Sequence, residues 1–215
     1  MIAILDYDAG NTASVVQAFH FLGEECVLTR DEAVILAADG VVLPGVGAFA
    51  DAMERIREYG FDRMIPKIVG SGKPFLGICL GLQLLFDASE EVAQGSGMET
   101  VPGLGILPGT IRRFPSGMQA GEDLLKIPHM GWNQIQIRED SRLFRGIPSG
   151  SFVYFVHSYY LDAVRKEDVA ATSDYGIVFD AAAEHENVFA CQFHPEKSGE
   201  VGLKILRNFV ALTKE

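Results

Sequence analysis

The spacing of apolar residues predicts alternating strands and helices in the first half of the chain. Four short apolar runs predict strands, at residues 1–6, 25–29, 40–43 and 74–78. Segments in which apolar residues fall on one helical face, or that end at a stop signal, predict helices at residues 12–22, 31–38, 49–59 and 62–69. Because each strand is followed by a helix, the pattern predicts a mostly parallel sheet covered on both faces by helices.

The pattern changes in the second half. Residues 88–103 are rich in Gly, Ser and Glu and predict a surface loop. Most later segments predict strands, several of them antiparallel and joined by turns such as 174–176: residues 106–114, 132–137, 152–161, 169–173 and 188–193. The last segment, 199–213, predicts an amphipathic helix. The chain shows no internal repeat, low-complexity linker or clean domain boundary.

Composition narrows the class of protein. The 215 residues suit one large domain or two small ones, and the net charge of −11 without a long basic run argues against a nucleic-acid partner. No apolar run is long enough to span a membrane, and residues 1–6 predict a first strand rather than a signal peptide. The three widely spaced cysteines, Cys26, Cys79 and Cys191, suggest neither a disulfide framework nor a zinc site, and they favour a reduced, cytoplasmic setting.

Residues 73–83 carry the clearest chemical signal. They predict a strand, a sharp turn between two glycines and then a helix, with Cys79 in the turn. An elbow of the form Gly-x-nucleophile-x-Gly holds its side chain away from the sheet, and a helix N-terminus favours a thiolate over a thiol. The pattern predicts that Cys79 is a catalytic nucleophile. Taken alone, the motif fits a buried structural cysteine about as well.

A base and an acid are available at the end of a later strand. His194 follows the strand predicted at 188–193, so it shares the sheet edge of Cys79 if that strand is parallel to the others. In extended backbone, residues i and i+2 point to the same side, so Glu196 can orient the His194 imidazole as in a catalytic triad. The acid follows the histidine by two residues, unlike the order in α/β-hydrolases.

An acyl-transfer site also needs donors for an oxyanion. The backbone N–H of Leu80 follows the nucleophile, and the loop 44–47 could supply a second N–H, although Pro44 cannot donate. Each motif alone is compatible with an ordinary turn or loop. Because all three motifs fall at the carboxyl ends of predicted strands, their combination favours a cysteine acyl-transfer enzyme.

These motifs carry a resemblance to a known family. Residues 77–83, 194–196 and 44–47 resemble those of class I (triad) glutamine amidotransferases. Residues 128–133 and 154–159, with the turn 8–11, are similar to the glutaminase subunits of imidazole glycerol phosphate synthases. The resemblance runs essentially from end to end, except in loops where no match can be asserted (88–103 and 114–125). It implies a single amidotransferase domain over residues 1–215, with a flavodoxin-like central sheet and antiparallel strands in the second half.

The resemblance also implies a mechanism without a cofactor or a metal. Cys79 attacks the carboxamide of glutamine, His194 moves the proton, and Glu196 orients His194. The N–H groups of Val46 and Leu80 stabilise the oxyanion. Four further residues are expected to hold the amino-acid end of glutamine: Gly47, Gln83, Ser158 and Tyr159.

In this family the ammonia passes to a cyclase subunit, so the resemblance implies a heterodimer. Asn11, Trp132 and Tyr154 match positions at or near that interface, although strand packing explains Trp132 and Tyr154 equally well. His129 and His157 are interpreted as structural or interface residues. We expect the Val46 N–H to enter the oxyanion hole only when the partner is bound.

Three alternatives remain open on the sequence. One is a paralogous subunit that feeds ammonia to a different synthase, and another is a stand-alone cysteine hydrolase. The third is a non-enzymatic binding module on the same fold with an inert cysteine.

Overall fold

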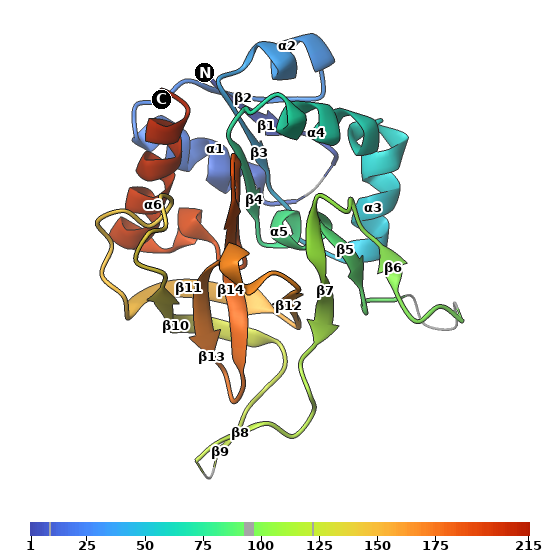
Figure 1. The fold of residues 1–215 in the computed structure, drawn as a ribbon, viewed down its shortest axis with the longest axis vertical. Helices are drawn as coiled ribbons and strands as arrows, with labels where there is room; N and C mark the ends of the chain where they lie inside the picture. Colours follow the sequence, from blue (N-terminus) through green and yellow to red (C-terminus); the bar gives the residue numbers. More distant parts are fainter. Residues whose placement is uncertain (9, 93–96, 122) are drawn as a thin grey trace.

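The centre of the molecule is a parallel sheet between two layers of helices. The computed structural model describes residues 1–8, 10–92, 97–121 and 123–215. The parallel strands lie in the order β2-β1-β3-β4-β15 (Figure 1): β1 (Ile2–Leu5), β2 (Cys26–Thr29), β3 (Gly40–Leu43), β4 (Phe75–Ile78) and β15 (Val188–Cys191).

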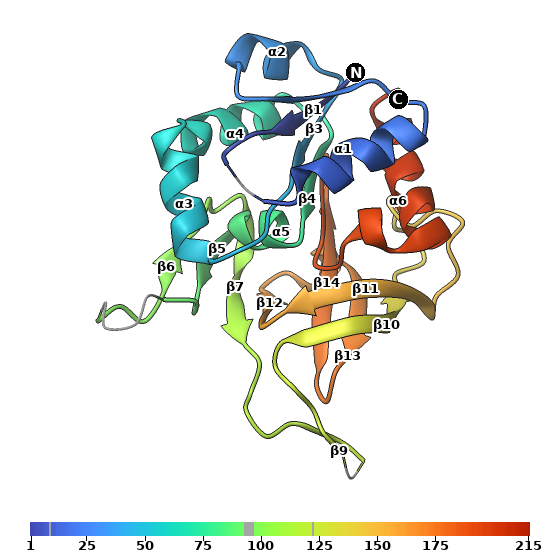
Figure 2. The same ribbon diagram turned by 180° about the vertical axis from the view of Figure 1, so that it is seen from behind.

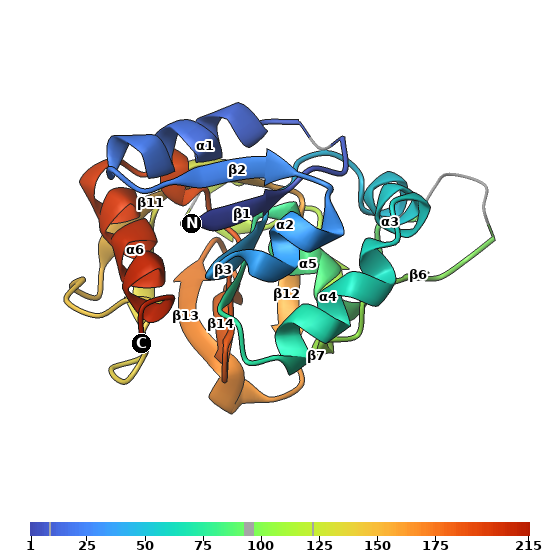
Figure 3. The same ribbon diagram turned by 90° about the horizontal axis from the view of Figure 1, so that it is seen from above.

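Helices cover both faces of this sheet. Figure 3 shows the two layers from above. One face carries α1 (Thr12–Phe21) and α6 (Gly199–Leu212). The opposite face carries α2 (Glu32–Ala37), α3 (Phe49–Glu58), α4 (Phe61–Gly70) and the short α5 (Leu80–Leu84). The alternation predicted from the apolar pattern is therefore confirmed.

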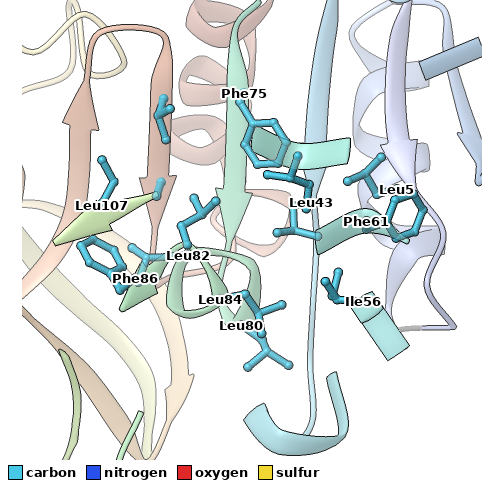
Figure 4. Packing of buried hydrophobic residues seen from close by; sticks show 14 of the residues in the cluster. Leu5, Leu43, Ile56, Phe61, Phe75, Leu80, Leu82, Leu84, Phe86 and Leu107 are labelled. Carbon is cyan, nitrogen blue, oxygen red and sulfur yellow. The ribbon is translucent and has the colours of Figure 1, made fainter. Parts of the chain in front are cut away.

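The two-residue period of the strands divides the core into two clusters. In β1, Ala3 and Leu5 belong to the cluster under α2 to α5, whereas Ile2 and Ile4 belong to the cluster under α1 and α6. Both faces are apolar because successive side chains of a strand point to opposite faces, and each face is covered by helices. Figure 4 shows Phe75, Leu43 and Leu5 of the first cluster among side chains of the covering helices.

The antiparallel half continues from the same sheet. The strand β14 (Val178–His185) pairs antiparallel with β15, β13 and β12, and Figure 2 shows β10 and β11 beneath the helical half. The remaining strands are β5 (Phe86–Ser89), β6 (Val101–Pro102), β7 (Leu107–Arg113), β8 (Gln119–Ala120), β9 (Asp123–Leu124), β10 (His129–Ile137), β11 (Ser151–His157), β12 (Tyr159–Ala163) and β13 (Val169–Asp174). Two 3₁₀ turns complete the fold, η1 (Lys166–Asp168) and η2 (Pro195–Lys197).

Three sequence predictions need correction. The strand β14 was missed, because its three consecutive alanines and its charged residues do not give a strand pattern. The strand predicted at 152–161 is two strands, β11 and β12, interrupted at Ser158. The loop predicted at 88–103 contains the end of β5 and all of β6, and its residues 93–96 lie outside the described residues. None of the helices in the described ranges has the length and apolar character needed to cross a bilayer.

Two glycines let functional segments approach other backbone closely. A Cβ on Gly81 of α5 would lie 1.8 Å from the carbonyl oxygen of Leu43, at the end of β3. A Cβ on Gly202 of α6 would lie 1.8 Å from the carbonyl oxygen of Pro195, at the start of η2. No side chain can occupy either position without moving the backbone, so these contacts fix the helix after Cys79 and the turn after His194.

We expect the Gly81→Ala substitution to lower the free energy of unfolding by about 3 kcal/mol, because the new methyl group overlaps a backbone oxygen that cannot move independently. Urea denaturation followed by circular dichroism measures the change. The matched control is Gly70→Ala at the end of α4, where a Cβ meets no atom within 4 Å. That control should be neutral or stabilising by about 0.5–1 kcal/mol. Equal stability of the Gly81→Ala variant and the wild type would contradict the close approach.

Candidate active site

Cys79 stands between β4 and α5 in a strained backbone conformation. Its φ of 56° and ψ of −109° lie outside the regions that side-chain-bearing residues favour. Its backbone N–H donates to the carbonyl of Cys191 in β15 at 2.8 Å, and its carbonyl accepts from Leu82 at 3.0 Å. Hydrogen bonds on both sides thus hold the elbow and present the thiol at the carboxyl edge of the parallel sheet. A conformation of this kind costs about 1–3 kcal/mol and is common at functional sites.

His194 and Glu196 lie at the same edge because β15 pairs parallel with β4. The imidazole Nδ1 donates to Glu196 Oε1 at 2.7 Å, and both side chains are buried. The amide of Asn11 donates to the same oxygen at 3.0 Å. The proximity predicted from extended backbone is present, but its cause differs: only His194 is extended, and Glu196 lies in the 3₁₀ turn η2.

The surroundings of His194 favour its protonated form. Burial lowers the pKa of the imidazole, but the Cys79 thiol and the Glu196 carboxylate outweigh that effect and raise it to about 9. Nε2 has no partner in hydrogen-bonding geometry among the described residues, although Cys79 lies close enough to raise the pKa. The ring nitrogen that does not contact Glu196 is therefore free to exchange a proton with the thiol or with a substrate.

Most of the predicted site residues line one cleft of about 330 Å³. Cys79 and His194 share it with Val46, Gly47, Leu80, Gln83, Ser158 and Tyr159. Glu196 and Asn11 lie behind His194, around a smaller neighbouring recess. The loop 44–47 and the Cys79 elbow, distant in sequence, meet here as their positions at carboxyl ends of neighbouring strands predict.

One of the two predicted oxyanion donors, the N–H of Leu80, is already paired with backbone. The N–H of Leu80 donates to the carbonyl of Gly45 at 3.3 Å. The preceding carbonyl, of Pro44, accepts the buried hydroxyl of Tyr7 at 2.7 Å. The loop is thus held with a carbonyl, rather than an N–H, facing the donor that follows the nucleophile.

One functional candidate was missed by sequence reasoning. Glu91 lines the cleft, and its carboxylate accepts the backbone N–H of Phe49 at 2.9 Å. Burial raises the pKa of this carboxyl, partly offset by the bond from Phe49. No sequence signal singled out Glu91, because it follows β5 inside the segment interpreted as a surface loop.

His129 and His157 form a buried, neutral pair. Burial lowers the pKa of His129 to about 4 and that of His157 to about 3. Because the Tyr159 carbonyl can only accept, His157 Nδ1 donates to it at 2.8 Å, and His157 Nε2 then accepts from His129 Nδ1 at 3.0 Å. Both rings pack among aromatic side chains such as Phe179. His157 is also one of the residues that line the cleft. We interpret its neutral ring as part of the aromatic packing.

Two residues expected at the partner interface lie on neighbouring antiparallel strands. Trp132 of β10 pairs with Tyr154 of β11, and their ring centroids are 6.1 Å apart in an edge-to-face arrangement. The Trp132 side chain is 55% exposed. Asn11, the third such residue, contacts Glu196, and Ala9 of the turn 8–11 lies outside the described residues.

The thiols of Cys26 and Cys191 play no visible part in the site, and the described residues offer no metal centre. Burial raises the pKa of the Cys191 thiol well above its usual value, and the thiol donates to the carbonyl of Phe193. Cys26 lies half-buried against the carbonyl of Val16. Within the described part of the chain, no cluster of three or more His, Cys, Asp or Glu side chains could hold a metal ion.

Comparison with known proteins agrees with this geometry. Three relatives named imidazole glycerol phosphate synthase subunit HisH match nearly from end to end. The protein of Syntrophotalea carbinolica is 52% identical over 97% of this chain and 98% of the relative. That of Geobacter metallireducens is 50% identical over 99% and 98%, and that of Thermosynechococcus vestitus is 50% identical over 100% and 98%.

Solved structures agree on the fold. One described as a glutamine amidotransferase gives a TM-score of 0.73 at 19% identity, covering 100% of this chain and 99% of that chain. A chain in the structure of PurLQS from Thermotoga maritima gives 0.71 at 18% identity, covering 98% and 97%. The family model for class-I glutamine amidotransferases matches residues 3–212. With the elbow, the histidine–carboxylate pair and the fold in agreement, the chain belongs to the class-I glutamine amidotransferase family.

Proposed function

We propose that this chain hydrolyses glutamine to glutamate and ammonia through a thioester on Cys79. The observation that carries the proposal is a thiol and an imidazole in one cleft, with a buried carboxylate 2.7 Å behind the imidazole. A histidine with a pKa of about 9 is a strong enough base to hold the proton of Cys79 at neutral pH, so a thiolate–imidazolium pair can form before glutamine arrives.

The residues then divide the reaction into two steps. The sulfur attacks the carboxamide carbon, and the His194 proton passes to the amide nitrogen, which leaves as ammonia. A water molecule gives a proton to His194 and attacks the thioester carbon, the Cys79 thiolate leaves, and glutamate is released with the proton again on His194. Glu196 fixes the ring orientation through its hydrogen bond to Nδ1 and stabilises the imidazolium.

We infer a closed state of the proposed oxyanion hole, and the position of the Gly45 carbonyl supports it. This carbonyl accepts a hydrogen bond from the Leu80 N–H, the donor that a tetrahedral oxyanion would need. Rotation of the peptide between Gly45 and Val46 would free that N–H and turn the N–H of Val46 toward the cleft. The cyclase partner is the proposed trigger for this rotation.

Glutamine is the substrate, and the chain is the glutamine amidotransferase subunit of an imidazole glycerol phosphate synthase in histidine biosynthesis. Its partner is the cyclase subunit, to which the lyase step belongs, and the two form a heterodimer. We propose that residues 1–215 act as one amidotransferase domain, and that the exposed Trp132, with Tyr154 and Asn11, lies at or near the cyclase. Three free cysteines support a cytoplasmic location.

The Glu196→Gln substitution should lower the pKa of His194 from about 9, because it removes one of the charges that raise it. Since the folded pKa lies above the ordinary value of 6.5, charged His194 stabilises the fold fully below pH 6.5. That contribution disappears as the pH rises through about 9, so the stability advantage of the wild type should shrink over this window. NMR titration of the histidine ring signals measures the shift. The His129 signal, with a pKa of about 4, is the internal control; an unchanged His194 midpoint contradicts the assignment.

The glutaminase rate should be low for the lone chain and rise by about 100-fold or more when the cyclase and its ligand are present, since one oxyanion donor is worth about 10²–10³ in rate. Glutamate release from the purified chain, with and without the cyclase, tests this. Cys79→Ala should abolish the rate in both conditions. High turnover without the partner would show that the hole is already open.

The Glu91→Gln substitution should raise the KM for glutamine about tenfold, because a carboxylate in the cleft can pair with the α-ammonium of the substrate. Alkylation of Cys79 by iodoacetamide, which has no ammonium group, should proceed at the wild-type rate. The raised pKa of Glu91 predicts that the KM of the wild type increases as the pH falls, and that the variant loses this dependence. An unchanged KM would place the ammonium elsewhere.

A further inference from the structure

Gln192 is a buried polar side chain beside the nucleophile. It follows β15, and its side chain has no exposed surface. Its backbone N–H donates to the carbonyl of Ala181 in β14 at 2.9 Å, which fixes the main chain there. Its side-chain Nε2 lies 3.7 Å from the sulfur of Cys79, within the range of a hydrogen bond to sulfur. The mechanism described above leaves this contact without a role.

The direction of the Gln192 amide is fixed by two neighbours. The Tyr159 carbonyl can only accept, so the Gln83 amide presents Nε2 to it, at 3.3 Å. The same Gln83 nitrogen is 3.0 Å from Gln192 Oε1, and its two hydrogens serve these two acceptors. With its oxygen toward Gln83, Gln192 presents its NH₂ group to the sulfur. The reversed amide would place two NH₂ groups together and a carbonyl oxygen against a thiolate.

We propose that Gln192 is a catalytic hydrogen-bond donor to the Cys79 thiolate, held in that orientation by Gln83. The proposal rests on Cys79 being the nucleophile of the proposed function. The hydrogen stays on the amide nitrogen, and no proton is transferred. The donor stabilises negative charge on sulfur before attack, and again when the thiolate leaves as water hydrolyses the thioester.

Other titratable groups near the sulfur do not supply this contact. The Tyr7 hydroxyl donates to the Pro44 carbonyl, and burial first and Cys79 second raise its pKa, so it stays neutral. The Cys191 thiol donates to the Phe193 carbonyl. His194 supplies the exchangeable proton, with Glu196 behind it, while α5 carries no charged residue. From the β5 and β11 sides, the cleft is faced by Glu91 and by the neutral ring of His157.

The decisive variant is Gln192→Met, which keeps the length of the side chain and removes the donor. The assembled complex with the cyclase is treated with iodoacetamide from pH 5 to 10, and the modified Cys79 peptide is quantified by mass spectrometry. Below the midpoint of its pH profile, the alkylation rate should fall about tenfold, with the midpoint about one pH unit higher, as expected for loss of one charge-assisted hydrogen bond. Turnover of glutamine should fall at least as much. Gln17→Met, on the exposed side of α1, is the matched control and should change neither.

A second variant tests the orientation argument. Gln83→Met should shift the alkylation profile in the same direction, although Gln83 has no hydrogen bond to the sulfur, because it frees the Gln192 amide to reverse. The double variant should react no more slowly than Gln192→Met alone. Independent, additive effects would overturn the proposal, as would an unchanged profile in a folded Gln192→Met protein.

If Gln192→Met does not fold, Gln192→Leu replaces it. That variant fills most of the same buried space and offers no donor to the sulfur at any pH. Its profile should shift upward by about as much, and an unchanged profile would overturn the proposal. Failure of the proposed function has a different signature: in the wild type, Cys26 or Cys191 would be labelled in preference to Cys79.

Discussion

The close approach of α5 to the carboxyl end of β3 is the constraint on which the site depends. Gly81 leaves no room for a Cβ against the Leu43 carbonyl, so the helix must begin directly beneath the loop that follows β3. That position sets the strained backbone of Cys79 and brings the N–H of Leu80 to the carbonyl of Gly45. The order of the strands positions His194, because β15 pairs with β4 on the side opposite β3 and ends at the same edge of the sheet. The proposed nucleophile, base and oxyanion loop are therefore positioned by rigid backbone contacts.

Because the polar groups of the site are buried, each depends on its hydrogen-bond and charge partners. The His194 and Glu196 side chains are almost completely buried, and a charge without a partner there would be costly. The pair is tolerated because Asn11 also donates to the carboxylate and because the imidazole is held at 2.7 Å. The Tyr159 carbonyl has a similar organising role. It accepts from His157 and from Gln83, so it joins the buried histidine pair of β10 and β11 to the amides beside the sulfur.

The sequence was sufficient for the parallel half of the fold, because its strands are short apolar runs and each helix has clear ends. It failed where tertiary contacts override local preference. The alanine-rich β14 is a strand because it is paired on both sides, and the break at Ser158 arises from the change of partner between β11 and β12. Within the site, Cys79 and His194 were predictable from turns at strand ends. Gln192 and Glu91 were not, because one looks like an interior strand residue and the other like part of a polar loop.

In the proposed mechanism, the conformation of the loop 44–47 would leave the chain inactive even with its predicted catalytic groups in place. The Leu80 N–H is already satisfied by the Gly45 carbonyl, and the Tyr7 hydroxyl holds the neighbouring Pro44 carbonyl. Opening the hole exchanges one backbone hydrogen bond for contacts to substrate, a difference of about 0.5–1.5 kcal/mol for an ordinary bond. Binding at a partner surface can supply a free-energy difference this small, whereas the strained Cys79 backbone and the buried pair behind it are too firmly packed to change. Under the proposed mechanism, the loop is therefore the part of the site that a second chain could control without moving Cys79, His194 or Glu196.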